Sequence, residues 1–253
     1  MKILFKKMDR LTRENIKNDK TSMPHIQMLY PEQHNIRIKL MYKIFIIIIG
    51  LSLLLTGCDT KPSEEIGYGT IVNDVYTNNY FNMSIKVPDN WTVQSQASQQ
   101  ELMKTGSNLF SGEDKSLKSI LKEAEKQTVN MFSFFKFEQG SPVSFNPSIM
   151  SIAVRMSHMP GVKRGSDYHF HAKKLLESGH MKYEFPNEIY TKDISGISFD
   201  VMPAQITINN FTVYQEYYAA RINDYVLMFI LSYSSDSEID ELNQIISRLK
   251  ISN

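Results

Sequence analysis

The segment ISFDVMPAQITINNFTVYQEYYAARINDYVLMFILSY, residues 197–233, contains three β-rich runs separated by two pairs of turn residues. The runs cover about 197–208, 211–222 and 225–233, and the pairs between them are Asn209-Asn210 and Asn223-Asp224. Asn and Asp tolerate the positive φ that a two-residue hairpin turn requires. Two-residue connections cannot join parallel strands, so the segment predicts an antiparallel meander. The third run is apolar on both faces, which predicts a strand in the centre of the sheet.

The residues after the meander predict a helix that packs on it. Ser235 and Glu238 have the spacing of a capping box. The apolar side chains that follow recur at helical spacing and form one long stripe: Ile239, Leu242, Ile245, Ile246 and Leu249. A stripe of this kind is typical of a helix lying across a sheet.

The upstream part of the chain predicts further strands and helices. Two β-rich runs, 70–77 and 80–87, are separated by Asn78-Asn79, and a short strand follows at 91–93. Helices are expected from Ser98 to about Lys104, after Asp114, and after Ser166, and strands at 131–137 and 149–156. The fold class predicted for residues 69–253 is therefore α+β, an antiparallel β-sheet with helices packed on it.

The hairpin leading to Val87-Pro88-Asp89-Asn90-Trp91, together with the closing meander and helix, resembles the PsbP-like group that includes the DcrB lipoproteins. The resemblance covers about 69–253. It implies a PsbP-like α/β/α sandwich that serves binding or assembly, with no family-wide catalytic residues to transfer. The Phe-rich region around 131–150 departs from that pattern.

A second stretch, KIFIIIIGLSLLLTGC at residues 43–58, predicts where the protein is located. Its apolar part, 44–55, is about 18 Å long as a helix and too short to cross a bilayer core of about 30 Å. A basic flank, a short apolar run and small residues at its end are typical of a signal peptide.

Leu55-Thr56-Gly57-Cys58 resembles the lipobox of bacterial lipoproteins. The resemblance implies that the Cys58 thiol receives a diacylglycerol, and that signal peptidase II recognises Leu55, Thr56 and Gly57 and cuts before Cys58. Two acyl chains are enough for stable membrane anchoring, whereas one is marginal. The alternative, a buried structural cysteine, fits poorly because a polar segment containing Pro62 follows at once.

These features divide the chain into four parts. Residues 1–40 form a polar leader. The leader is either dispensable, or mis-annotated, in which case translation starts at Met41. Residues 41–57 form the lipoprotein signal peptide. Residues 58–68 are expected to be a tether, and 69–253 the folded domain. The sequence decides neither the Gram type of the source nor which membrane is used, although Asp59 would favour inner-membrane retention in a Gram-negative cell.

Removing residues 1–57 changes the charge of the protein. They hold 10 of the 28 basic and 4 of the 27 acidic residues, so the remaining chain has 18 basic, 23 acidic and a net charge of −5. An acidic body gives no electrostatic basis for binding nucleic acid, and the acyl chains must hold the protein on the membrane. Cys58 is the only cysteine, so the domain folds without an intramolecular disulfide.

No residue pattern predicts a catalytic, cofactor or metal site. His169 and His171 lie two apart on a predicted helix, about 200° around it, and cannot both face one ion. If that segment were a strand, they would share a face. Tyr214 and Tyr218 are expected on one side of their strand and Tyr217 on the other, either as a binding face or, in the favoured interpretation, as cross-strand aromatic pairs.

The sequence therefore predicts a lipid-anchored extracytoplasmic protein of the cell membrane, serving as a binding or assembly factor for an envelope protein or component. Enzymatic activity is the less favoured interpretation. The alternatives are a small envelope hydrolase, which needs a pocket with at least two titratable side chains in reach of each other, and a solute-receptor lipoprotein of a transporter, which usually needs two α/β lobes.

Overall fold

The computed structural model describes residues 66–208 and 210–252. The predicted leader, the signal peptide and its residues Leu55, Thr56 and Gly57, the lipidation position Cys58 and most of the tether lie outside the described residues. No helix within the described ranges is long and apolar enough to span a membrane.

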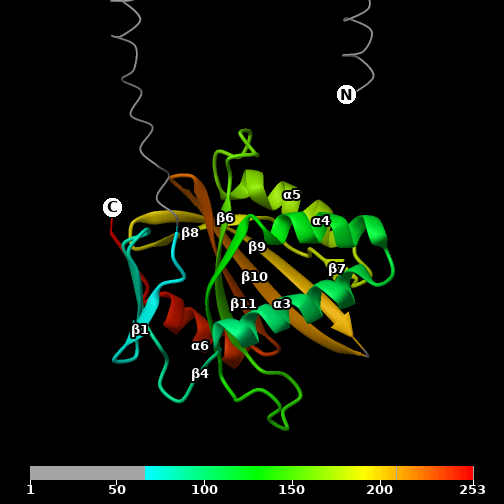
Figure 1. The fold of residues 1–253 in the computed structure, drawn as a ribbon. Helices are drawn as coiled ribbons and strands as arrows, with labels where there is room; N and C mark the ends of the chain where they lie inside the picture. The colour runs from blue at the N-terminus through cyan, green and yellow to red at the C-terminus, as the bar shows by residue number, and fades with distance from the viewer. Residues whose placement is uncertain (1–65, 209, 253) are drawn as a thin grey trace, which may run out of the picture. The chain divides into compact units, whose positions relative to one another are not determined.

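The centre of the domain is an antiparallel sheet of eight strands, here called the large sheet (Figure 1). In spatial order its strands are β4 (Thr92–Val93), β5 (Thr128–Phe135), β6 (Ser148–Arg155), β11 (Tyr225–Tyr233), β10 (Phe211–Ile222), β9 (Ile197–Ile208) and β7 (Tyr183–Glu184), and β8 (Tyr190–Ile194) also pairs with β9. The predicted meander is thus confirmed as β9–β10–β11, and β11 is central. The strands expected at 131–137 and 149–156 are present as β5 and β6, which extend the sheet beyond β11.

A second antiparallel sheet, the small sheet, has the order β1 (Thr70–Val72), β2 (Val75–Asn78), β3 (Met83–Lys86) and β12 (Lys250–Ile251). The composition of the run 70–77 predicted one strand, but the run forms a hairpin. Asn73 and Asp74 have φ of 50° and 58°, so two residues with the required positive φ interrupt it and Val72 pairs with Val75.

Four helices pack against this framework: α3 (Gln96–Ser111), α4 (Lys115–Glu125), α5 (Gly165–Glu177) and α6 (Asp236–Ile246). The prediction for α3 was wrong at both ends. The helix begins after Ser95, whose hydroxyl accepts the Ser98 backbone N–H at 3.1 Å, and it continues to Ser111 instead of ending near Lys104. Its last turn is held by tertiary contacts: Phe110 is buried, and its carbonyl accepts the His180 backbone N–H at 2.8 Å.

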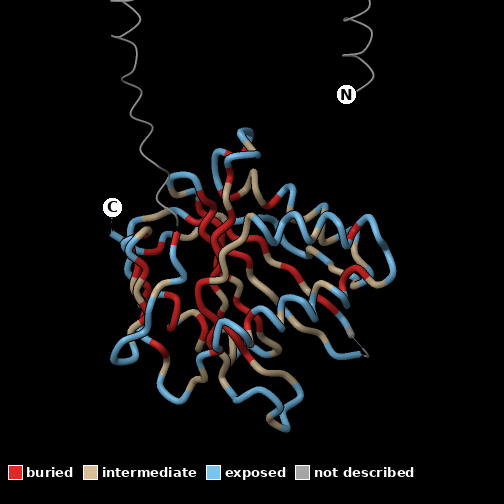
Figure 2. Tube along the Cα trace, in the orientation of Figure 1, coloured by how far each residue is buried: buried red, intermediate tan, exposed pale blue. Residues whose placement is uncertain are grey.

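The core consists of two clusters on opposite faces of the large sheet. Successive residues of β11 alternate between them, with Leu227 and Phe229 in the first cluster and Val226 and Met228 in the second. The first cluster also holds the inner faces of the small sheet and α6, and the second packs against α5. Figure 2 shows the buried residues concentrated along these central strands. The fold class is therefore α+β, an antiparallel sheet with helices on it, as predicted.

Candidate functional site

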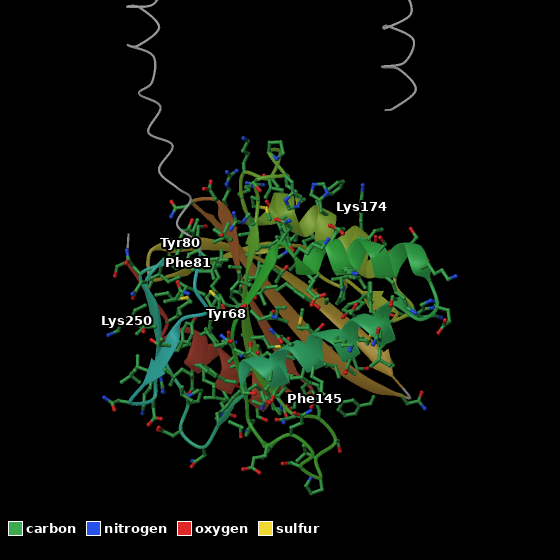
Figure 3. The ribbon with its side chains drawn as sticks, in the orientation of Figure 1. Tyr68, Tyr80, Phe81, Phe145, Lys174 and Lys250 are labelled. Atoms are coloured by element: carbon green, nitrogen blue, oxygen red, sulfur yellow. The ribbon has the colours of Figure 1, made fainter. Side chains whose placement is uncertain are left out.

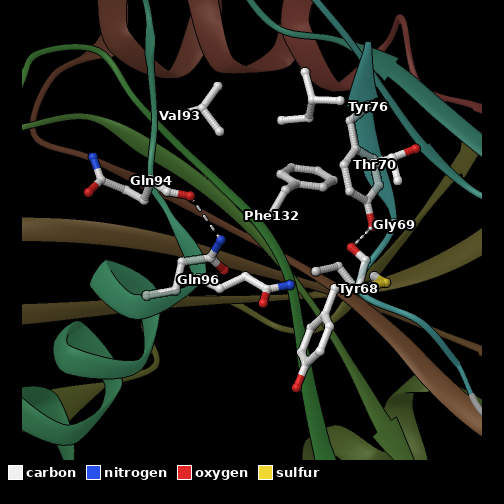
Figure 4. Close-up of a pocket in the computed structure, with 11 residues that line it drawn as sticks. Tyr68, Gly69, Thr70, Tyr76, Val93, Gln94, Gln96 and Phe132 are labelled. Atoms are coloured by element: carbon white, nitrogen blue, oxygen red, sulfur yellow. Dashed lines mark hydrogen bonds between the residues drawn. The ribbon is translucent and has the colours of Figure 1, made fainter.

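A cavity of about 120 Å³ opens between the edge strands of the two sheets. One wall comes from β4 and the start of α3, the other from β1 and β2, and Phe132 of β5 lies between them (Figure 4). A larger cavity of about 410 Å³ adjoins it and shares the segment 68–70 and Gln96. Tyr68 and Tyr80, both labelled in Figure 3, line this second cavity. We call the two cavities together the edge pocket.

The chain enters the folded domain along the wall of this pocket. Ile66, which lies within the predicted tether, is buried in the first core cluster. Two side chains of β2 then hold the following backbone: Asn78 Nδ2 donates to the Gly67 carbonyl and the Tyr76 hydroxyl donates to the Tyr68 carbonyl, both at 2.9 Å. The folded part thus begins by Ile66, three residues before the expected boundary at Gly69.

Gly69 is required where this segment crosses β2. Its φ is +79°, and a Cβ at this position would collide with the Tyr76 hydroxyl and the Thr77 carbonyl oxygen. Only glycine adopts such a φ without steric cost and permits such a close approach. The wall of the edge pocket therefore depends on a backbone contact that no larger residue allows.

Gln99 gives the edge pocket an unpaired hydrogen-bond acceptor. Its side chain is 3% exposed and its Nε2 donates to the Gln94 carbonyl at 3.2 Å. Its Oε1 is buried and accepts no hydrogen bond from the described part of the protein. A buried acceptor without a partner costs about 1–3 kcal/mol, so an N–H or O–H donor that reached this oxygen would be stabilising.

The remaining lining residues carry no charge. They are amides, hydroxyls, aromatic rings and aliphatic side chains, and no Asp, Glu, His, Lys or Arg among the described residues lines either cavity. Burial raises the pKa of Tyr76 to about 12, so its phenol stays neutral at physiological pH. The edge pocket can therefore orient a neutral ligand, but its lining supplies no general acid–base pair.

The tyrosines singled out from the sequence lie as predicted on the two faces of β10. Tyr218 belongs to the first core cluster and Tyr217 to the second. Tyr214 pairs with Tyr233 across β10 and β11, and their rings stack with centroids 5.6 Å apart. The favoured interpretation, cross-strand aromatic pairing, is therefore confirmed for Tyr214.

The structure adds a polar network around these tyrosines. Tyr218 donates its hydroxyl hydrogen to Glu216 Oε2 at 2.8 Å, and Lys192 Nζ donates to the Tyr218 hydroxyl at 3.2 Å and to Asn243 Oδ1 at 2.7 Å. Burial, and then the charge of Glu216, raise the pKa of Tyr190 to about 12 and that of Tyr218 further. We call Tyr190, Tyr214, Tyr218, Tyr233 and Glu216 the tyrosine–glutamate cluster.

The histidines do not converge. His169 and His171 both lie on α5, as predicted, with His169 buried and His171 exposed. His169 Nε2 lies 2.9 Å from the Asp200 carbonyl oxygen, which fixes the ring against β9. Within residues 66–208 and 210–252, no three His, Cys, Asp or Glu side chains are grouped closely enough to hold a metal ion.

No sequence pattern indicated the edge pocket, and of the tyrosine–glutamate cluster the sequence singled out Tyr214 and Tyr218 but not Tyr190 or Tyr233. Gln94, Gln99, Tyr190 and Lys192 belong to no motif and stand far in sequence from the residues that they meet. Trp91 belongs to the segment on which the PsbP-like resemblance rests. It is half-buried against the first cluster, and its Nε1 donates to Glu241 Oε1 at 3.1 Å.

Comparison with known proteins finds similarity in structure only. No family model matches the chain, and no curated protein matches it in sequence. Similar solved structures include CyanoP, the cyanobacterial PsbP of Synechocystis sp. PCC 6803, at 11% identity over 76% of this chain and 99% of that one, with a TM-score of 0.44. They also include LpqN of Mycobacterium tuberculosis, described as involved in cell envelope biogenesis, at 14% identity over 68% of this chain and 84% of that one, with a TM-score of 0.39.

Proposed function

We propose that this protein is a lipid-anchored binding factor on the extracytoplasmic side of the cell membrane, and that the edge pocket is its ligand site. The sequence 43–58 supports the anchor, because it combines a short apolar run with Leu55-Thr56-Gly57-Cys58. The acyl chains supply location, and the α+β domain supplies the recognition surface.

The order of the chain keeps the edge pocket close to the membrane. Gly67, which lines the larger cavity, follows Cys58 by nine residues. Even a fully extended segment of that length spans at most about 32 Å. This short separation along the chain favours a ligand from the envelope over a solute taken from bulk.

The observation that carries the proposal is the neutral lining of the edge pocket around Gln99 Oε1. A hydrolase needs titratable groups in contact with its substrate, and the lining residues offer amides, hydroxyls and aromatic rings instead. Such a lining fits a neutral ligand with an amide or hydroxyl donor for Gln99 and an apolar part for Phe132 and Tyr68. Binding is thus favoured over catalysis.

The anchor is tested by the fate of Cys58. Mature protein extracted from membranes should begin at a diacylated Cys58 by mass spectrometry, and globomycin should block its processing. Cys58→Ala should leave the protein unacylated. An intact leader and a free thiol in the native protein would contradict the membrane assignment.

The pocket is tested separately by native mass spectrometry of the membrane-extracted protein. We expect a bound neutral molecule in the wild type and its loss in Gln99→Leu, which removes the acceptor at similar volume. Gln244→Leu, on the exposed side of α6, is the matched control and should retain the molecule. Equal occupancy in the two variants would exclude the edge pocket as the site.

A further inference from the structure

The tyrosine–glutamate cluster presents a partly open surface on the large sheet, separate from the edge pocket. Tyr214, Glu216 and Tyr218 alternate along β10 and therefore share one face. Tyr218 is fully buried and forms the floor, whereas Tyr190 and Tyr214 are 42% and 38% exposed. Solvent-facing tyrosines thus surround a half-buried carboxylate.

Glu216 accepts a hydrogen bond from Tyr218 and has no cationic partner among the described residues. Its Oε2 accepts the Tyr218 hydroxyl at 2.8 Å, and in the part of the chain that the structure describes it forms no ion pair. The nearby Lys192 is directed to Asn243 and the Tyr218 hydroxyl, with its Nζ 5.5 Å from the centre of the Tyr218 ring. A half-buried carboxylate held by neutral donors remains attractive to a cation.

The surroundings strengthen this negative character. Helix α6 carries Asp236, Glu238, Asp240 and Glu241 and no basic residue. Glu241 is paired with Lys136 at 2.6 Å, and Asp236 and Asp240 are exposed. Tyr233 lies opposite Tyr214 on β11, and burial, followed by the charge of Glu216, raises its pKa to about 12.

We propose that the tyrosine–glutamate cluster binds an arginine side chain of a protein partner, with the guanidinium on Glu216 and the rings of Tyr190, Tyr214 and Tyr233 beside it. A guanidinium matches a carboxylate through two parallel N–H donors, and its flat, weakly hydrated face stacks on tyrosine rings. The acidic residues of α6 provide the charge complementarity that orients a basic segment.

The test is calorimetric titration of the mature lipidated protein in detergent micelles with the peptide acetyl-Gly-Arg-Gly-amide. A peptide with citrulline in place of arginine has nearly the same shape without the charge, and a lysine peptide has the charge without the planar fork. We expect the arginine peptide to bind at least tenfold more tightly than the citrulline peptide and more tightly than the lysine peptide. Equal binding of the arginine and citrulline peptides, or preference for lysine, would overturn the proposal.

Two variants and a matched control locate the binding. Glu216→Gln should weaken arginine binding at least tenfold, whereas Asp240→Asn, which removes the same charge from an exposed position of α6, should change it less than twofold. Tyr214→Leu, at an exposed position that leaves the core intact, should weaken it about two- to fivefold. Equal losses in Glu216→Gln and Asp240→Asn would indicate diffuse charge attraction and contradict a built site.

Discussion

His169 shows how one buried side chain makes the stability of the domain depend on pH. Burial lowers the pKa of His169 below its ordinary value, outweighing the favourable carbonyl of Asp200. Below about pH 6.5 the unfolded chain takes up a proton at this residue that the folded chain excludes. We therefore expect the free energy of unfolding to fall as the pH drops below about 6.5. Above that pH, His169 should not affect the free energy of unfolding.

Urea unfolding at pH 7.5, 6.5 and 5.5 measures this effect. His169→Gln should reduce the loss of stability between pH 6.5 and 5.5, whatever its effect at pH 7.5. His171→Gln, at an exposed position of the same helix, should keep the wild-type dependence. The same slope in His169→Gln and wild type would assign the pH dependence to other groups.

Gly165 fixes how closely α5 approaches the large sheet. A Cβ on Gly165 would collide with the carbonyl oxygen of Ala219 in β10. Gly165→Ala should therefore destabilise the domain by about 1–3 kcal/mol, because helix and strand must move apart. Gly161→Ala is the control, since a Cβ there meets nothing within 4 Å, and it should change the free energy of unfolding by less than about 0.5 kcal/mol. Equal effects of the two substitutions would contradict this account.

Among the elements, α4 depends on its cap more than on burial. Leu117, Ile120, Leu121 and Ala124 stand at helical spacing, but only Leu117 is buried and Ile120 is 51% exposed. The Asp114 carboxylate accepts the backbone N–H groups of Ser116 and Leu117 at 2.8 and 3.0 Å. The Asp114 side chain thus stabilises the first turn of this helix.

Asp114→Ala should cost about 0.5–2 kcal/mol, as cap removal does in other helices. We expect amide hydrogen exchange to accelerate in the first turn of α4, while exchange in β11 reflects only the global change. Asp114→Asn keeps an acceptor and should lose less than half as much stability. Unchanged exchange in the first turn of Asp114→Ala would show that tertiary contacts hold α4.

At the scale of the whole molecule, both core clusters share one sheet. Phe229 packs into the first cluster beside Phe132 and Phe199, and Met228 enters the second from the neighbouring position of β11. Each cluster packs on one face of β11, so loss of either cluster exposes that face. The domain should therefore unfold in a single transition.

Phe229→Ala should lower the free energy of unfolding by about 3–5 kcal/mol and Met228→Ala by about 2–5 kcal/mol. In each variant the Trp91 fluorescence and the far-ultraviolet circular dichroism should report the same urea midpoint. Two separated midpoints in either variant would show that the clusters unfold independently.

The sequence alone determined the meander, the closing helix and the α+β class, because these depend on neighbouring residues. Two-residue turns, period-two alternation and a 3.6-residue stripe are all set within a few positions of each other. The lipid anchor at Cys58 is likewise inferred from one short motif. It stays a prediction that chemical analysis of the protein can test.

Only the tertiary structure decided the edge pocket and the tyrosine–glutamate cluster. Gly67, Gln99 and Phe132 come from three separate segments of the chain, as do Lys192, Tyr218 and Asn243. Their side chains meet because two sheets and α6 pack around one core. Hydrogen bonds and ring contacts act over a few ångströms in space, so no spacing along the chain reveals which distant residues will share them.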